Sequence, residues 1–313
     1  MLPSPGMGSG LVAVDWGSTR FRAYRIEAGA VVDRLASARG IAGTPPEALA
    51  GVLVEALAPW RPWIEDTRVP VAMIGMIGSN RGLRDAGYTR LPVTLDELAS
   101  ADVEVEIASA LATRVAIRRG LALEDRQADA FDVMRGEDVQ LLGAERLRPA
   151  GLYVLPGTHS KWIPVERRAG HVSVRTFTTV MTGELYAWLV DESLVCRGIP
   201  DARLWSDEAF ARGVESATRE GELFIEMFRT RARWLLGDLA PEAAPSYLSG
   251  LLIGHEIVTM TKRHATDGRV IVVGAARLAA LYANAMARLG IAAEVVDDEA
   301  ALVGGFARMS DGR

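Results

Sequence analysis

The chain has 313 residues, of which 49% are hydrophobic, with a formal net charge of −5 and a pI near 5.6. This length and apolar content suffice for two hydrophobic cores, and the mildly acidic balance argues against nucleic acid as a partner. The lone Cys196 excludes an intramolecular disulfide, the four histidines lack zinc-binding spacing, and no stretch reaches the roughly 20 apolar residues of a membrane span, so we expect a cytoplasmic protein.

Near the N-terminus, residues 11–27, LVAVDWGSTRFRAYRIE, predict a β-hairpin. An apolar strand leads into the polar turn DWGSTR, and an alternating strand follows. Backbone N–H groups and small hydroxyls in this turn, at Gly17, Ser18 and Thr19, suit phosphate oxygens. Asp15, at the end of the first strand, is placed to hold a magnesium ion through water. The alternative interpretation is an ordinary core hairpin with a polar tip.

The following segments alternate between strand-like and helix-like patterns, which indicates the α/β class. A third strand is expected over Ala30–Ala36, and an apolar helix over Ala48–Ala58 with Thr44 as its cap. A short apolar run, Val69–Ile74, predicts a buried parallel strand that ends at GMIGSNRG.

The residues after this strand form a candidate substrate loop. In open α/β sheets ligands bind beyond the carboxyl ends of the strands, which is where Ser79, Asn80 and Arg81 lie. Arg81 suits a carboxylate, and the other two suit sugar hydroxyls. A solvated turn with a surface arginine is the alternative.

Residues 132–147, DVMRGEDVQLLGAERL, contain a helix start. Gly136 breaks the pattern, and Glu137 and Asp138 follow it as two carboxylates in the first turn, where the helix dipole favours negative charge. Because they are adjacent, we expect only one of them to face a ligand, and we favour Glu137. The next residues, 148–151, form the predicted boundary between domains 8–148 and 149–313.

The second half opens with a copy of the first hairpin. A shift of 141 residues lays Leu11 on Leu152 and Phe21 on Trp162, and the turn PGTHSK falls where DWGSTR lies in the first copy. The pattern therefore predicts two similar domains, each with a phosphate-binding turn. In the second turn we expect Thr158 and the backbone around Gly157 to hold phosphate groups of a nucleotide. Lys161 would add a positive charge there, and the alternative is a lysine that is merely solvated at the edge of the hairpin.

The remainder is expected to be mostly helical, with a late strand pair. Thr182 is expected to cap the helix over Leu185–Leu189, and the alternative is that the N-terminus of this helix faces a nucleotide. Four apolar residues of the helical segment 207–239 are assigned to the core: Leu223, Met227, Trp234 and Leu235. After the strand Arg269–Val273, the small residues Gly274 and Ala275 allow an adenine or a nucleotide backbone to lie close.

Six segments in order, DWGSTRFRAY, GMIGSN, VMRGEDVQ, LPGTHSKW, MTGELYAWL and LSGLLIGHE, resemble the 2-dehydro-3-deoxygalactonokinases of the actin/hexokinase/Hsp70 superfamily, over roughly residues 10 to 308. The resemblance implies two RNase H-like domains, each a mixed sheet with flanking helices, around a nucleotide cleft. It also implies ATP and Mg²⁺ as cofactors, and phosphorylation of the 6-hydroxyl of 2-dehydro-3-deoxy-D-galactonate. The loop departs from the expected family pattern, with Asn80-Arg81-Gly82-Leu83 in place of Arg-Gln-Gly-Trp.

Site roles follow from the resemblance. An acidic residue at the helix start before the second hairpin is the general base of such kinases, here Glu137 or Asp138. Asp15 would be the other catalytic carboxylate, which holds magnesium through water. The loop 79–81 and Arg20 would bind the sugar acid. The partner is then a small molecule, and the sequence leaves the oligomeric state open.

Parts of the sequence also suit three other functions. Residues 270–298 form a strand–helix–strand unit with acids at Asp297 and Asp298, as in a dinucleotide-binding oxidoreductase, but the unit lacks G-x-G-x-x-G. An ATP-gated binding or scaffold protein of the same fold would need neither the sugar-acid loop nor the acid pair. A kinase of the same fold acting on another sugar or sugar acid is the third alternative.

Overall fold

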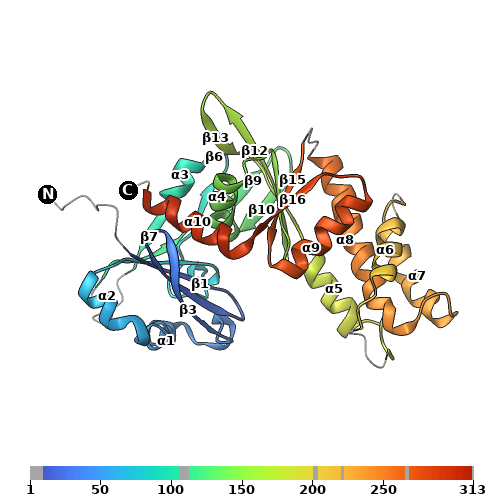
Figure 1. Ribbon diagram of the computed structural model, residues 1–313, viewed down its shortest axis with the longest axis horizontal. Helices are drawn as coiled ribbons and strands as arrows, with labels where there is room; N and C mark the ends of the chain where they lie inside the picture. The colour runs from blue at the N-terminus through green and yellow to red at the C-terminus, as the bar shows by residue number, and fades with distance from the viewer. Residues whose placement is uncertain are drawn as a thin grey trace. The chain divides into compact units, whose positions relative to one another are not determined.

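The computed structural model describes residues 10–105, 111, 113–199, 204–219, 222–264 and 268–311, which fall into two compact units (Figure 1). The first unit consists of the chain up to Leu147, together with two later segments, Arg167–Thr176 and the segment from Glu299. The second consists of Arg148–Glu166 and Phe177–Asp298. The expected limits, 8–148 and 149–313, differ from this division in the two segments that return to the first unit. The helix and strand content agrees with the expected α/β class.

The first unit is organised on a six-stranded sheet in the order β3-β2-β1-β4-β8-β7. Strands β1, β2 and β3 form an antiparallel meander, β4 and β8 continue parallel to β1, and β7 is antiparallel to β8. Their bounds are β1 Leu11–Trp16, β2 Phe21–Glu27, β3 Ala30–Ser37, β4 Val71–Ile74, β7 Asp102–Glu104 and β8 Val115–Arg118.

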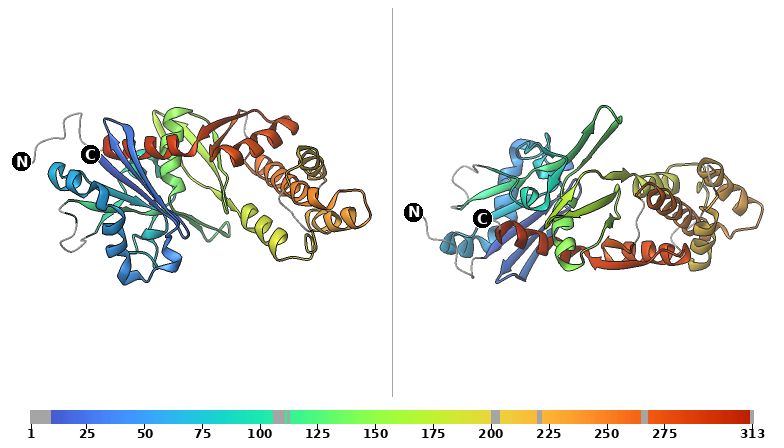
Figure 2. Two further views of the ribbon diagram at one scale, coloured as in Figure 1. Left: turned by 60° about the horizontal axis from the view of Figure 1, so that its bottom comes forward. Right: turned by 90° about the horizontal axis from the view of Figure 1, so that it is seen from above.

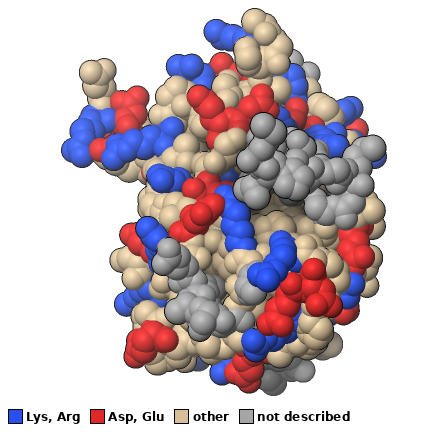
Figure 3. Space-filling view, turned by 90° about the vertical axis from the view of Figure 1, so that its left-hand side faces the viewer, with Lys and Arg blue, Asp and Glu red and all other residues tan. Residues whose placement is uncertain are grey.

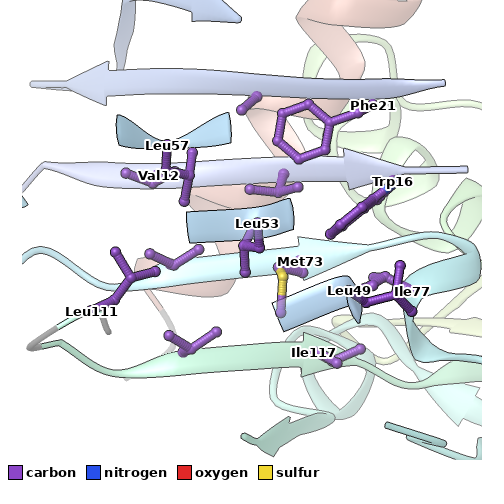
Figure 4. Packing of buried hydrophobic residues seen from close by; sticks show 14 of the residues in the cluster. Val12, Trp16, Phe21, Leu49, Leu53, Leu57, Met73, Ile77, Leu111 and Ile117 are labelled. Atoms are coloured by element: carbon purple, nitrogen blue, oxygen red, sulfur yellow. The ribbon is translucent and has the colours of Figure 1, made fainter. Parts of the chain in front are cut away.

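Helices cover both faces of this sheet. Helices α1 (Leu49–Ala56) and α2 (Arg61–Thr67) lie on one face, and α4 (Glu137–Leu147) and α10 (Asp298–Asp311) lie on the other (Figure 2). In the core below α1, side chains of the strands meet Leu49, Leu53 and Leu57, as Figure 4 shows. Burial of this apolar surface is the main stabilising term of the unit.

The two returning segments join the first unit through contacts that local sequence patterns do not reveal. Strand β13 (His171–Val174) pairs with β6 (Val93–Thr94), beside the short helix α3 (Leu95–Ala99). Helix α10 packs directly on α4, where a Cβ added at Gly143 would lie 1.8 Å from the Ala301 carbonyl oxygen. A separate three-stranded sheet of this unit has the order β10 (Ala130–Met134), β9 (Gly120–Asp125) and β5 (Tyr88–Arg90).

The second unit repeats the strand order around its own hairpin. Strand β11 pairs antiparallel with β12 and parallel with β15, which is followed by β16, while β14 pairs with β12. The bounds are β11 Leu152–Leu155, β12 Ser160–Arg168, of which residues 160–166 belong to this unit, β14 Thr178–Val180, β15 Val270–Gly274 and β16 Ala293–Asp297.

The helices of this unit form two cores. Helices α8 and α9 pack on the sheet, and α5, α6 and α7 pack with α8 in a helical cluster. Their bounds are α5 Thr182–Asp191, α6 Asp207–Ser216, α7 Leu223–Leu235, α8 Ala244–Arg263 and α9 Ala276–Arg288. Glycine permits the closest contact, because a Cβ at Gly250 of α8 would lie 2.0 Å from the Phe210 carbonyl oxygen of α6.

The shift of 141 residues reproduces the topology but not the register of the hairpin. Val14 pairs with Ala23, whereas Leu155, which the shift lays on Val14, pairs with Lys161. The first strand of the second hairpin stops earlier because Pro156 has no N–H with which to continue the ladder.

Three local expectations are wrong. Thr44 does not cap a helix: its hydroxyl donates to the Gly40 carbonyl, and a 3₁₀ turn precedes α1. Thr182 is the first residue of α5 rather than its cap, which is Met181. Leu235 is 56% exposed because it lies at the end of α7, beyond the face that buries Met227.

The charge distribution on the surface and the hydropathy of the helices agree with the mixed, mildly acidic composition of the chain. Acidic and basic side chains are interspersed over the face drawn in Figure 3, without a field of one sign. Among the helices of the described ranges, none combines the length and the apolarity that crossing a bilayer requires.

Candidate active site

Asp15 is oriented by the strand opposite to it. It lies one residue before the end of β1 and pairs across the ladder with Arg22 of β2. The Arg22 Nη2 donates to Asp15 Oδ2 at 2.6 Å, with the Asp15 side chain 20% exposed. Sequence reasoning missed Arg22, although its place opposite Asp15 follows from the hairpin register.

Two glycines bring the end of β4 and the start of α4 close to Asp15. At Gly75 the backbone has φ +88°, and an added Cβ would lie 3.2 Å from Asp15 Oδ1. At Gly136 φ is +106°, and an added Cβ would lie 3.6 Å from the Gly75 Cα. Glycine alone adopts such backbone angles without strain. The structure therefore places Asp15, the substrate loop and the acid-bearing helix start next to one another.

The two acids at the start of α4 have different surroundings. Glu137 is half-buried, and its Oε2 accepts a hydrogen bond from the Arg135 backbone N–H at 3.0 Å. Asp138 is fully buried, and its Oδ1 accepts from the Gly136 N–H at 2.9 Å. Burial raises the pKa of Asp138, and the positive charge of Arg118 acts against that rise. Only Glu137 of the pair is open to a ligand in solution.

Arg118 is the buried partner of Asp138, and sequence reasoning missed it. The guanidinium lies at the end of β8, 1% exposed, with Nε 3.6 Å from Asp138 Oδ2 and Nη1 3.0 Å from Asp102 Oδ1. One buried cation thus compensates two carboxylates. These contacts join β7, β8 and the first turn of α4.

The predicted substrate loop is partly exposed. Ser79 is buried, and its Oγ accepts the Arg81 backbone N–H at 3.3 Å, while the side chains of Asn80 and Arg81 face solvent. Within the described residues, the Arg81 guanidinium makes no hydrogen bond or ion pair. The loop therefore presents one uncommitted cation and one amide.

A second arginine adjoins the same loop. The Arg135 guanidinium lies over the Tyr88 ring at 4.5 Å, and its Nη2 donates to the Gly87 carbonyl at 3.2 Å. A Cβ added at Gly78 would lie 3.0 Å from Arg135 Nη1. Arg135 lies inside the VMRGEDVQ segment, but nothing in that pattern shows that its side chain reaches the loop.

The first turn is closed by its own backbone. The Gly17 N–H donates to the Arg20 carbonyl at 2.9 Å, so it is engaged within the turn. Ser18, Thr19 and Arg20 are exposed, and Ser18 and Thr19 line a cavity of about 500 Å³ with residues 38–40 and 42–45, Ala48 and Val52.

The second turn borders a cavity of similar volume, about 510 Å³, which is here termed the second-unit pocket. Gly157 and Thr158 of the turn and Ala275 line it, as the sequence predicts for a nucleotide site. The sequence did not predict most of its other walls, which come from α5, α8, α9 and the segment before α6: Thr182, Gly183, Tyr186, Trp205, Ser249, Leu252, Ile253, Arg277, Leu278, Leu281 and Tyr282.

Other predicted nucleotide residues have different positions. Lys161 is buried, and its Nζ donates to the His159 carbonyl at 2.9 Å, which ties the ammonium to the turn itself. Gly274 ends β15, directly before Ala275.

A family model described as 2-keto-3-deoxy-galactonokinase matches residues 15–309 of this chain. The chain belongs to this family. It is 33% identical over 295 residues to a protein of Escherichia coli (strain K12) named 2-dehydro-3-deoxygalactonokinase, and the alignment covers 94% of this chain and 95% of that relative. The resemblance of the six sequence segments is thereby confirmed.

Solved structures agree with this membership. A crystal structure assigned to a 2-dehydro-3-deoxygalactonokinase protein from Sinorhizobium meliloti is 32% identical, covers 96% of this chain and 97% of its own, and superposes with a TM-score of 0.82. The ADPNP-bound activator of 2-hydroxyisocaproyl-CoA dehydratase from Clostridium difficile covers 97% of this chain and 95% of its own, with 11% identity and a TM-score of 0.51. At that identity the likeness shows the fold alone.

Proposed function

We propose that this chain catalyses the ATP-dependent phosphorylation of the 6-hydroxyl of 2-dehydro-3-deoxy-D-galactonate. Family membership over residues 15–309 carries the proposal. The grouping of Asp15, the substrate loop and Glu137 in the first unit supports it, because a sugar-acid kinase needs these three parts together.

The proposal includes the finer fold assignment. We infer that each unit is an RNase H-like domain of the actin/hexokinase type. The repeated strand order, β2-β1-β4-β8 in the first unit and β12-β11-β15-β16 in the second, supports this assignment.

ATP and magnesium fit the residues that are present. The second-unit pocket has apolar walls and a bordering turn that suit a nucleoside and its phosphates. Within the described residues no three His, Cys, Asp or Glu side chains gather as metal ligands. Mg²⁺ does not require such a cluster, because it commonly keeps water ligands and binds through substrate phosphates with one or two carboxylates. Asp15 would hold the ion through water, and the ion would neutralise charge on the phosphates.

In the proposed reaction, Glu137 is the general base. Its carboxylate takes the proton of the 6-hydroxyl, whose oxygen bonds to the γ-phosphorus while the bond to the β-phosphate oxygen breaks, leaving ADP. Asp138 is less suited, because it is buried and engaged with Arg118. Its contacts with Gly136 and Arg118 would instead hold the first turn of α4 in place.

We propose that Arg81 binds the carboxylate of the substrate. The other polar groups of the substrate would be bound by three residues, Ser79, Asn80 and Arg20. The uncommitted and exposed Arg81 guanidinium supports this role, since a charge-assisted pair with a carboxylate selects an acid over a neutral sugar.

A coupled ADP-release assay tests the proposal. Purified protein with MgATP is offered a panel of 2-keto-3-deoxy acids, aldonates and hexoses, and phosphorus NMR locates the new phosphate ester. We expect the highest kcat/KM with 2-dehydro-3-deoxy-D-galactonate and a 6-phosphate product. A higher kcat/KM with another acid would show that the proposed substrate is wrong. ADP release without phosphate transfer to any acceptor would overturn the kinase assignment.

A further inference from the structure

Helix α8 carries a buried carboxylate to which the proposed reaction gives no role. Glu256 lies within the helix, 2% exposed, at the end of the LSGLLIGHE segment that marks the family resemblance. A buried carboxylate is costly unless hydrogen-bond donors surround it, so its contacts are informative.

Its contacts are hydrogen-bond donors from three other elements. Trp162 Nε1 of β12 donates to Glu256 Oε1 at 2.7 Å, and the Tyr282 hydroxyl of α9 donates to Oε2 at 2.7 Å. The Ser160 hydroxyl lies 3.4 Å from Oε2 and 2.9 Å from the Tyr282 hydroxyl. The side chain of Thr182, the first residue of α5, also hydrogen-bonds to the carboxylate.

Two of these donors belong to the walls of the second-unit pocket, and a third adjoins the turn that borders it. Thr182 and Tyr282 line the pocket directly, and Ser160 begins β12 immediately after the turn that contributes Gly157 and Thr158. Glu256 itself does not line the pocket and lies behind its walls.

The start of α5 also contacts the turn that contains Gly157 and Thr158. The Glu184 N–H donates to the Thr158 carbonyl at 3.0 Å, and a Cβ added at Gly183 would lie 2.3 Å from the Gly157 carbonyl oxygen. The turn thus lies in close contact with the first turn of α5, which Glu256 holds through Thr182.

The groups around Glu256 are hydrogen-bond donors, so they suit a carboxylate, which only accepts hydrogen bonds. Burial raises the pKa of Glu256, and the hydrogen bonds from Thr182, Tyr282, Trp162 and Ser160 act against that rise. Burial and the neighbouring carboxylate raise the pKa of Tyr282 well above its ordinary value, so the phenol keeps the proton that it donates. An amide in place of the carboxylate would direct an N–H at one of these donors.

We propose that Glu256 is a positioning residue for nucleotide binding, which holds the turn, the start of α5 and Tyr282 in the arrangement that receives the nucleotide. The inference rests on the proposed function, since it assigns the second-unit pocket to ATP. Glu256 touches no reacting atom in this assignment, so its effect should fall on affinity for the nucleotide.

Titration calorimetry with MgADP and steady-state kinetics on the full chain test this role. For Glu256→Gln we expect the Kd of ADP and the KM of ATP to rise about 10- to 100-fold, the size of a buried donor left unpaired. The KM of the sugar acid should change less than about twofold. Tyr282→Phe keeps the pocket-lining ring and removes one donor, so a rise of about 3- to 10-fold is expected even if the glutamine variant does not fold.

Glu226→Gln is the matched control. Glu226 is a carboxylate of the same unit, 1% exposed, but it is held by Arg219 and Arg229 and lines no part of the pocket. Its variant should lower the thermal stability and leave the Kd of ADP unchanged.

The outcomes separate the two proposals. Wild-type affinity in both the Glu256→Gln and Tyr282→Phe variants overturns the positioning role alone. An equal loss of affinity in Glu226→Gln also overturns it, because general destabilisation then explains the effect. Absence of nucleotide binding by the wild-type protein overturns the proposed function itself.

Discussion

The two hairpins share a strand plan and differ in what supports their turns. In the first, an acid lies one residue before the end of the leading strand, and Arg22 of the opposite strand orients Asp15 from within the same hairpin. In the second, Pro156 takes the place of the acid, and the turn is braced by α5 and by the buried Glu256 network behind it. The repeated fold therefore carries different chemistry in each unit.

This difference predicts a kinetic division between the units. Changes near the first hairpin should reduce turnover or affinity for the sugar acid, because that unit holds the candidate acids and the candidate substrate loop. Changes near the second hairpin should reduce affinity for the nucleotide. Each substitution below, from the largest expected effect to the smallest, tests one side of this division.

Asp15→Asn should have the largest effect. Asp15 would hold the magnesium ion that neutralises charge on the phosphates. A cationic group that stabilises this charge in the transition state is worth about 10³–10⁵ in turnover, so we expect a loss of kcat of that order. The pair with Arg22 is partly exposed and is worth about 1 kcal/mol or less, so the fold should persist. Turnover and thermal unfolding are measured together, with exposed Asp66→Asn in α2 as the control. Normal turnover in Asp15→Asn would remove the first turn from the chemistry.

Glu137→Gln should lower kcat by about 10²–10⁴-fold, the usual contribution of a general base, while the KM of ATP changes little. Asp138→Asn is the paired variant. It leaves buried Arg118 with Asp102 as its partner, so we expect a loss of about 3 kcal/mol in unfolding free energy, at the low end for a broken buried pair. Its kcat should fall much less than that of Glu137→Gln. A larger loss of kcat in the Asp138 variant would instead identify Asp138 as the general base.

Arg81→Ala should raise the KM of the sugar acid about 10- to 150-fold, because a charge-assisted pair is worth about 1.5–3 kcal/mol. The KM of ATP should stay near the wild-type value. Arg84→Ala, an exposed arginine of the same loop whose Nη1 donates to the Glu104 carbonyl, is the control and should change neither constant. An unchanged KM for the sugar acid in Arg81→Ala would direct attention to Arg135 as the cation for the carboxylate.

Gly183→Ala tests the second hairpin through its backbone. The added Cβ would lie 2.3 Å from the Gly157 carbonyl oxygen, so the turn and α5 must separate. We expect the KM of ATP to rise about tenfold, a free-energy change near 1.4 kcal/mol, with kcat nearly unchanged. Gly151→Ala, where an added Cβ meets no atom within 4 Å, is the control. Loss of kcat without loss of ATP affinity would contradict the division between the units.

Much of the local structure could be predicted from sequence, because alternation of apolar and polar residues reflects a strand with one buried face. Residues 11–27 show this pattern, and β1 and β2 occupy nearly the predicted ranges. Helix ends were less predictable. Threonine is a residue type that commonly caps helices, but the Thr182 side chain hydrogen-bonds to Glu256 instead. Glu256 lies 74 positions away in the chain, so a local sequence pattern does not reveal this partner.

The sequence by itself determined the α/β class, the paired hairpins, the glycine-bounded loop and the family, since each depends on residues that are neighbours in the chain. Tertiary structure decided which acid is open to a ligand and which is buried. It also decided that Arg118 compensates Asp138 and that Glu256 supports the second-unit pocket. The physical reason is that burial and hydrogen bonding depend on the residues that surround a group in space, and packing alone brings those residues together.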